Sequence, residues 1–129
     1  MTAGFIDLPE VFPLEQGGEL NGVRVAYRTW GEPRAEATLI CHALTGSADA
    51  DDWWEGLFGL GKVFDPSRDY IVAANVLGGC SGTTGPTSRK PGRLAHFGPD
   101  FPAVSIRDMV RLQALLLDHI GVERLRLVI

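Results

Sequence analysis

The sequence contains only two cysteines, and neither lies in a pattern that binds metal or builds a disulfide framework. Cys41 and Cys80 are far apart, no Cys-x-x-Cys pair occurs, and the three histidines are scattered. Disulfide-rich domains and zinc sites both need several cysteines or histidines at short, regular spacings. These two classes are therefore excluded, and we expect two free thiols and no bound metal.

The sequence also lacks an excess of positive charge and a long hydrophobic run. It has 12 Lys and Arg against 16 Asp and Glu, which gives a net charge of -4. A nucleic-acid-binding protein needs a basic face, and a membrane-spanning helix needs about 20 apolar residues. The first residues, MTAGFIDLPE, lack the charged and apolar regions of a signal peptide. We expect a cytoplasmic protein without nucleic-acid or membrane partners.

What the sequence does contain is a hydrophobic content of 45%, which is sufficient for a buried core. Val23, Val25 and Tyr27 alternate with small or polar residues before the breaker Gly-Glu-Pro, which predicts a strand and a turn. We interpret the preceding residues 11–21 as the antiparallel partner of this strand. The sequence thus predicts an N-terminal hairpin at about residues 5–31.

Two continuous apolar runs follow, at residues 37–44 and 70–77. Such runs are typical of strands covered on both faces of a sheet. Trp53, Trp54 and further apolar residues between the runs favour a helix or a lid-like segment. Strand, crossover and strand together predict a βαβ unit.

A helix is predicted at residues 105–120 and a strand at 124–129. Ser105 and Asp108 form the pattern of a capping box, and Gly121 suits the end of the helix. Apolar residues at helical spacing predict its buried face: Ile106, Met109, Val110, Leu112, Leu116 and Ile120. The element order predicts one partial α/β domain over residues 1–129, the first half of an open, mostly parallel sheet.

The loop after the strand at residues 37–46 is a first candidate for chemistry. The sequence CHALTGS brings His42, Thr45 and small residues directly to the end of a buried strand. In α/β-hydrolase sheets the loop after the third strand gives a backbone N–H to the oxyanion hole. The alternative is an ordinary strand-to-helix turn with His42 as a partly buried structural residue.

The loop at residues 78–102 is a second candidate, because a loop of this length in a compact domain is usually functional. Gly78, Gly79 and Gly82 allow tight turns. No phosphate-binding glycine motif is present, which argues against a nucleotide site. A nucleophilic Cys80 is a further alternative, but the sequence places no histidine beside it. We favour a loop that forms a pocket wall.

The same loop carries a small basic patch made of Arg89, Lys90 and Arg93. Such a patch can bind the phosphates of an acyl carrier such as coenzyme A. On composition alone, a solvated surface is the simpler interpretation.

Taken together, six segments in this order resemble the homoserine O-acetyltransferase family: HALTG, WW, NVLGGCSGTTGPTS, DFP, SIRDMV and LLLDHIGV. The resemblance runs from about Leu20 to Ile129. It implies an α/β-hydrolase fold and transfer of an acetyl group from acetyl-CoA to L-homoserine in methionine biosynthesis. It implies no cofactor beyond acetyl-CoA as co-substrate, small-molecule substrates, and a homodimeric full-length protein.

The resemblance also implies roles for individual residues. The backbone N–H of Leu44 would donate to the oxyanion hole, and His42 and Thr45 would hold the shape of its loop. Gly78, Gly79, Cys80 and Gly82 would line the substrate pocket.

In this family the strand at residues 124–129 leads into the turn that carries the nucleophilic serine. The resemblance therefore implies that the catalytic Ser, Asp and His lie beyond Ile129, and that His42, Ser47 and Ser81 have no such role. We expect the 129-residue chain alone to be inactive and to have an exposed apolar edge at its last strand. Alternatives are a homoserine or serine O-succinyltransferase, a hydrolase of the same fold, and a non-catalytic truncated binding module.

Overall fold

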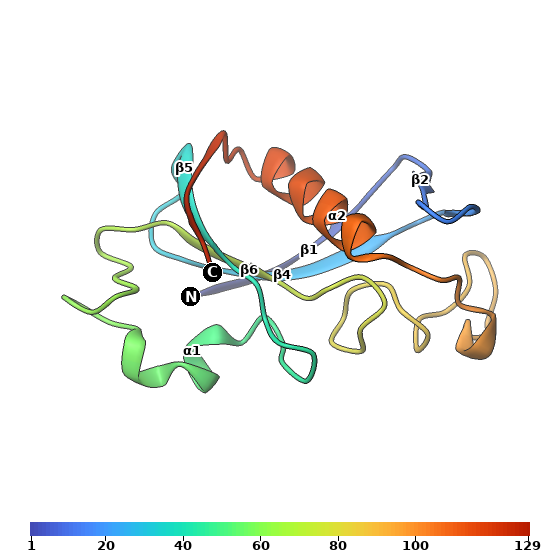
Figure 1. The fold of residues 1–129 in the computed structure, drawn as a ribbon, viewed down its shortest axis with the longest axis horizontal. Coiled ribbons are helices and arrows are strands. Elements are labelled where there is room, and N and C mark those ends of the chain that lie inside the picture. The colour runs from blue at the N-terminus through green and yellow to red at the C-terminus, as the bar shows by residue number, and fades with distance from the viewer.

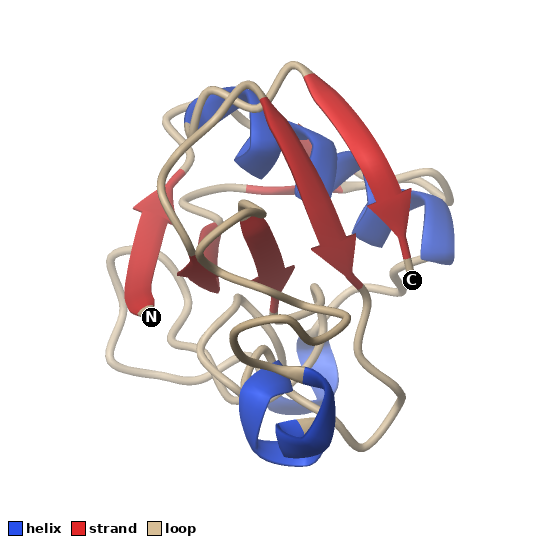
Figure 2. Ribbon diagram, turned by 90° about the vertical axis from the view of Figure 1, so that its left-hand side faces the viewer, coloured by secondary structure: helices blue, strands red, loops and turns tan.

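The computed structural model describes residues 1–129 and consists of a twisted mixed sheet with helices on both faces (Figure 1). In spatial order, the five strands are β1 (Thr2–Asp7), β4 (Arg24–Trp30), β6 (Ile71–Ala74), β5 (Glu36–Ile40) and β7 (Arg124–Val128). Strands β6, β5 and β7 are parallel, and β1 and β4 are joined to them in antiparallel fashion. Figure 2 shows the two chain ends at opposite edges of the sheet.

The positions of the helices follow from the order of the parallel strands. The chain passes from β5 to β6 on one side of β5, and then returns across β5 to reach β7 on its other side. Because both crossovers are right-handed, opposite directions of travel place their helices on opposite faces. Helix α1 (Ala50–Trp53) and the short helix η1 (Glu55–Leu57) accordingly lie below the sheet in Figure 1, and α2 (Ile106–His119) lies above it.

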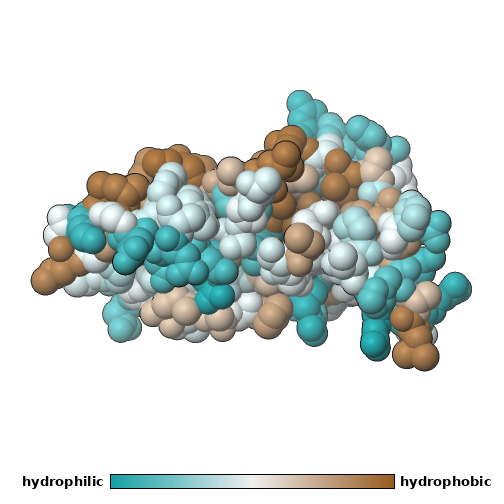
Figure 3. Space-filling view, turned by 90° about the horizontal axis from the view of Figure 1, so that it is seen from below, coloured by the Kyte–Doolittle hydropathy of each residue, from teal (hydrophilic) through white to brown (hydrophobic).

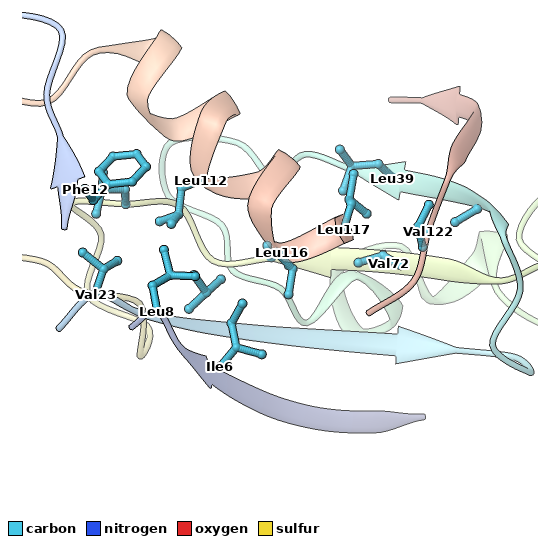
Figure 4. Close-up of a cluster of buried hydrophobic side chains, with 14 of the residues drawn as sticks. Ile6, Leu8, Phe12, Val23, Leu39, Val72, Leu112, Leu116, Leu117 and Val122 are labelled. Carbon is cyan, nitrogen blue, oxygen red and sulfur yellow. The ribbon is translucent and has the colours of Figure 1, made fainter. Parts of the chain in front are cut away.

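Each face of the sheet has its own hydrophobic core. Leu112, Leu116 and Leu117 of α2 pack toward Leu39 and Val72 of the sheet (Figure 4). On the other face, a smaller core joins the sheet to the α1 segment: Trp30, Ile40, Ala48, Ala50, Phe64, Ile71 and Ala73. The two continuous apolar runs of the sequence thus correspond to β5 and β6, whose residues are buried on both faces.

The N-terminal pairing differs from the sequence prediction. The partner of β4 is β1, with Thr2 opposite Thr29 and Asp7 opposite Arg24. Residues 11–21, predicted as that partner, form instead a separate small hairpin of β2 (Phe12–Pro13) and β3 (Glu19–Leu20). The prediction was wrong because Pro13 and Gly17–Gly18 turn the chain back within this segment, before it reaches β4.

Three further details bear on the sequence prediction. The segment between β5 and β6, predicted as a helix or a lid-like segment, contains two short helical turns: α1 ends at Trp53, and η1 begins at Glu55. Ile106 and Val110 of α2 are exposed although they fit the helical spacing. The expected exposed apolar edge is present, since β7 is the edge strand of the sheet and Leu127 and Val128 are 37% and 56% exposed. No helix has the length and apolar character that crossing a membrane requires.

A buried carboxylate fixes the start of α2. Ser105 and Asp108 form the predicted capping box: Ser105 Oγ accepts from Asp108 N at 3.1 Å, and Asp108 Oδ2 accepts from Ser105 N at 2.9 Å. The other carboxylate oxygen accepts from Glu15 N at 3.0 Å. Asp108 thereby links the helix to the small N-terminal hairpin, and Arg111 lies 3.6 Å from the same oxygen.

The hydrogen bonds of Asp108 also determine its ionisation. Burial raises the pKa of Asp108, but the N–H groups of Ser105 and Glu15, the Ser105 hydroxyl and the charge of Arg111 together outweigh burial and hold this pKa below its ordinary value of 3.8. A carboxylate with a lowered pKa in the folded state stabilises the fold above its unfolded pKa. That contribution is lost as the pH falls through the folded pKa.

We predict that Asp108→Asn destabilises the protein by about 2–4 kcal/mol at neutral pH, because an amide N–H then faces a buried N–H donor. The difference from wild type should shrink as the pH falls from about 4 through the lower pKa of the folded state, where the wild-type carboxylate also becomes protonated. Urea unfolding at several pH values measures both effects. Asp118→Asn, at an exposed position of the same helix, is the control and should change stability by less than about 0.5 kcal/mol. Equal midpoints for the two variants would contradict the role of Asp108.

Candidate active site

Three strand ends meet at one edge of the sheet. Strands β5, β6 and β7 are parallel, so their carboxyl ends point the same way. Cys41 N donates to Ile129 O at 2.6 Å, and Ile129 N donates to Leu39 O at 3.0 Å. The end of β7 therefore lies directly beside the start of the loop that follows β5. In open α/β sheets, ligands bind at this edge.

Two side-chain hydrogen bonds tie the loop after β5 to the end of β6. His42 Nε2 accepts from Val76 N at 3.2 Å, and Asn75 Oδ1 accepts from Ala48 N at 2.9 Å. Since Nε2 is an acceptor, the proton of the neutral ring is on Nδ1, which lies 2.8 Å from Ala43 O. Both nitrogens of His42 are thus engaged, and neither is free to act as a general base.

Leu44 lies at the tip of this loop, between the two hydrogen bonds. Its side chain is fully exposed, and its backbone N–H has no acceptor within the chain. Gly46 N donates to Ala43 O at 2.8 Å, which closes a tight turn around Leu44. The Thr45 side chain is exposed and makes no hydrogen bond. The geometry therefore leaves a backbone donor available at the tip of a loop with both ends fixed.

Two buried threonines, Thr83 and Thr84, anchor the glycine-rich loop that begins at Gly78. They bind the part of β4 that β6 does not pair with. Strand β6 pairs with β4 only from Tyr27 to Trp30, which leaves the first three residues of β4 without a strand partner on that side. Thr83 Oγ1 accepts from Ala26 N at 3.0 Å, and Thr84 Oγ1 accepts from Arg24 N at 2.8 Å. Threonine hydroxyls thus replace the missing strand and satisfy buried backbone groups.

Glycines let this loop fold tightly against itself and against the sheet. A Cβ atom at Gly85 would overlap the carbonyl oxygen of Gly79. Gly82 has a φ of 102° and lies against Ala26, so a side chain there would be strained and crowded. Gly78 donates its N–H to Thr84 O at 2.9 Å and lies beside Val104.

The two loops enclose a pocket of about 460 Å³. Leu44 and Thr45 line one side, Cys80 and Ser81 another, and Trp53 completes the wall. The Trp53 indole N–H donates to Ser47 O at 3.1 Å. A smaller adjoining space contains His42 and Gly79. The structure thus brings together His42, Leu44, Thr45, Gly79 and Cys80, whereas Gly78 and Gly82 lie outside the residues that line these two spaces.

Several residues of the site were not singled out from the sequence. Asn75 and the Thr83–Thr84 pair position the loops, and Ser81 lines the pocket. Asn75 directly follows an apolar strand, and Thr83 and Thr84 lie between two glycines. A polar residue next to a buried or glycine-rich segment was therefore the sequence signal that could have identified them.

The thiols near the site are free. Partial burial raises the pKa of the Cys41 thiol, and its sulfur lies 3.9 Å from Gln113 Oε1. Cys80 is exposed, and the nearby His42 already uses both ring nitrogens. The structure contains no group of three or more histidine, cysteine or carboxylate side chains that could hold a metal ion.

Solved structures with a similar fold are esterases and acetyltransferases. The chain superposes on esterase E22 with a TM-score of 0.84 and 29% identity, over 98% of this chain and 39% of that one. For homoserine O-acetyltransferase from Bacillus anthracis the TM-score is 0.85 at 25% identity, again over 98% and 39%. An acetylester hydrolase from Corynebacterium glutamicum gives 0.80 at 26%, over 98% and 36%. The strand order and the loop after the third main-sheet strand are those of the α/β-hydrolase fold.

Sequence relatives are more specific. The chain is 56% identical over 131 residues to the homoserine O-acetyltransferase of Chlorobaculum tepidum and 59% identical over 128 residues to that of Nostoc punctiforme. These matches cover 99% and 97% of the chain but 37% and 36% of the two relatives. No model of a known protein family matches the sequence. The chain is thus similar to homoserine O-acetyltransferases over nearly all of its own length, and it spans a little more than a third of the length of these relatives.

The packing of the glycine-rich loop gives a matched pair of variants. Gly85→Ala should destabilise the protein by about 2 kcal/mol or more, because the new methyl group displaces the Gly79 carbonyl. Gly56→Ala, where nothing lies within 4 Å, should change stability by less than about 1 kcal/mol. Urea unfolding compares the two, and amide NMR shifts should change around Gly79 and Cys80 only in the first. If both variants behaved like wild type, the loop would be less tightly packed than the structure indicates.

Proposed function

We propose that the protein is a homoserine O-acetyltransferase, which transfers the acetyl group of acetyl-CoA to the hydroxyl group of L-homoserine. The observation that carries this proposal is the 56–59% identity to relatives with that name over nearly the whole chain. The pocket beside the free N–H of Leu44 supports it, because acyl transfer requires a donor for an oxyanion.

In the proposed reaction a serine hydroxyl attacks the thioester carbonyl, and a histidine takes its proton. The resulting oxyanion collapses, the C–S bond breaks, and the CoA thiolate leaves with that proton. The homoserine hydroxyl then attacks the acyl-enzyme by the same steps in reverse. We assign the serine, histidine and aspartate to no residue of this chain, so the 129 residues alone should be inactive.

In this proposal the chain contributes the oxyanion donor and the pocket walls. The N–H of Leu44 would stabilise both oxyanions, a contribution of about 3 kcal/mol for a single donor. A nucleophile on a turn directly after β7 would lie beside this loop, since Ile129 is hydrogen-bonded to Cys41 and Leu39. His42 and Asn75 would act as positioning residues, because they hold the loop and leave its N–H free.

The same proposal includes the finer properties of the protein. Its substrates would be small molecules, L-homoserine and an acyl-CoA, with no cofactor beyond acetyl-CoA as co-substrate. We propose a cytoplasmic location and a homodimer for the complete protein, as the family resemblance implies. A succinyl donor or a serine acceptor remains the alternative within the family, and a non-catalytic binding module the alternative outside catalysis.

Hydrolysis is a second candidate activity, and a specific observation favours it. Esterase E22 and the acetylester hydrolase of Corynebacterium glutamicum superpose on this chain about as well as the acetyltransferase of Bacillus anthracis does. The two activities differ in the group that attacks the acyl-enzyme, which is water in one and an amino-acid hydroxyl in the other.

Product analysis tests the proposal. The complete protein, whatever its length, is incubated with acetyl-CoA and L-homoserine, and products are measured by mass spectrometry. We expect O-acetyl-L-homoserine and free CoA in equal amounts, and little product with succinyl-CoA or L-serine. Acetate as the main product would instead establish an esterase. No consumption of any acyl donor would support a binding module.

A backbone variant tests the role of Leu44. Leu44→Pro removes the N–H, so we predict a loss in kcat of about 100-fold or more. Leu44→Ala keeps the N–H and should retain activity within about threefold, because the exposed side chain is not the donor. Circular dichroism and thermal unfolding of both variants check that the fold is intact. A proline variant with normal kcat would exclude Leu44 as the oxyanion donor.

A further inference from the structure

One loop in the second half of the chain carries positive charge without any carboxylate of its own. Residues 70–99 contain Arg89, Lys90 and Arg93 but no aspartate or glutamate, in a chain with a net charge of -4. An acid-free segment of this length in an acidic protein is a local reversal of charge, and it can attract anions.

This loop forms a compact hairpin. Phe97 N donates to Ser88 O at 2.9 Å, Lys90 N to Ala95 O at 2.9 Å, and Arg93 N to Lys90 O at 3.0 Å. Arg89 and His96 face each other in an antiparallel bridge. The backbone that carries the two arginines is therefore held by hydrogen bonds, and the side chains are presented from a defined turn.

The two arginines of the hairpin lack the partners that the eight other arginines have, among which Arg34 donates to Arg68 O at 2.6 Å. Seven arginines lie within 4.0 Å of a carboxylate: Arg24, Arg28, Arg68, Arg107, Arg111, Arg124 and Arg126. Lys90 is paired as well, with Asp100 at 2.7 Å, and this hydrogen bond lowers the pKa of Asp100. Arg89 and Arg93 are exposed and have no carboxylate partner. Their charge is available to a ligand.

The hairpin is joined directly to the glycine-rich loop of the candidate active site. Gly85 N donates to Ser88 Oγ at 2.9 Å, Ser88 N donates to Gly85 O at 2.9 Å, and Gly98 N donates to Pro86 O at 2.8 Å. The base of the hairpin thus continues the wall that carries Cys80 and Ser81. Residues 88–100 lie at the right-hand end of Figure 1, and the same end of Figure 3 is largely hydrophilic.

We propose that Arg89 and Arg93 bind the phosphate groups of the acyl-CoA donor while its thioester occupies the pocket beside Leu44. This inference rests on the proposed function. In CoA a flexible pantetheine arm separates the thioester from three phosphate groups, so a cationic site away from the reacting atoms can add to the binding of the donor. Guanidinium groups bind phosphate oxygens with two parallel hydrogen bonds and stay charged at all relevant pH values. Their contribution is to binding of the donor, and they take no part in the acyl transfer itself.

The test compares two donors in the complete protein. For the double variant Arg89→Gln/Arg93→Gln we expect KM for acetyl-CoA to rise about tenfold with kcat unchanged. KM for acetyl-pantetheine, which has no phosphate, should not change. Added salt should raise the wild-type KM for acetyl-CoA and have a much smaller effect on the double variant. Arg107→Gln, an exposed arginine on α2 paired with Glu15, is the control and should leave both KM values unchanged.

Other outcomes separate the two proposals. An unchanged KM for acetyl-CoA in the double variant, or an equal rise for both donors, overturns the phosphate role and leaves the acetyltransferase proposal intact. If wild type transfers no acetyl group, the proposed function fails, and calorimetry with CoA and with pantetheine decides the role of the arginines. Binding of CoA weakened by the double variant then supports a phosphate site, and equal binding overturns it.

Discussion

The parallel pairing of β5 with both β6 and β7 is the constraint on which the rest of the structure depends. A strand with parallel neighbours on both sides needs one crossover on each face, because each crossover is right-handed. This requirement produces two cores, a small one under the α1 segment and a larger one under α2. It also brings the ends of three strands to one edge, so that the loops after β5 and β6 meet there.

Beyond the paired parts of the strands, polar side chains make the hydrogen bonds that backbone groups make within the sheet. Thr83 and Thr84 satisfy the part of β4 that β6 does not reach, and Asn75 and His42 hold the neighbouring loop. Asp108 has the corresponding role at the start of α2, where it accepts from two segments far apart in the sequence. Each of these side chains forms a hydrogen bond that fixes the relative position of two chain segments far apart in the sequence.

The sequence predicts local features well and pairing poorly. The apolar runs at β5 and β6, and the capping box of Ser105 and Asp108, depend on neighbours in the chain and are present in the structure. The predicted partner of β4 was wrong, because alternation of apolar residues indicates a strand but does not determine which strand pairs with it. The position of Leu44 came from family resemblance, and the contribution of Asn75 depends on a contact 27 residues away that no local pattern encodes.

The threonine anchor has a consequence for which positions of the glycine-rich loop can be substituted. Thr83 and Thr84 bind the loop to β4 on one side of Cys80 and Ser81, and the buried Leu77 and strand β6 hold the chain on the other side. Cys80 and Ser81, which face the pocket, are both exposed. Substitutions at these two positions would alter the lining of the pocket while the sheet keeps its hydrogen bonds. The residues that line the pocket, Cys80 and Ser81, are thereby distinct from the threonines that hold the loop to the sheet.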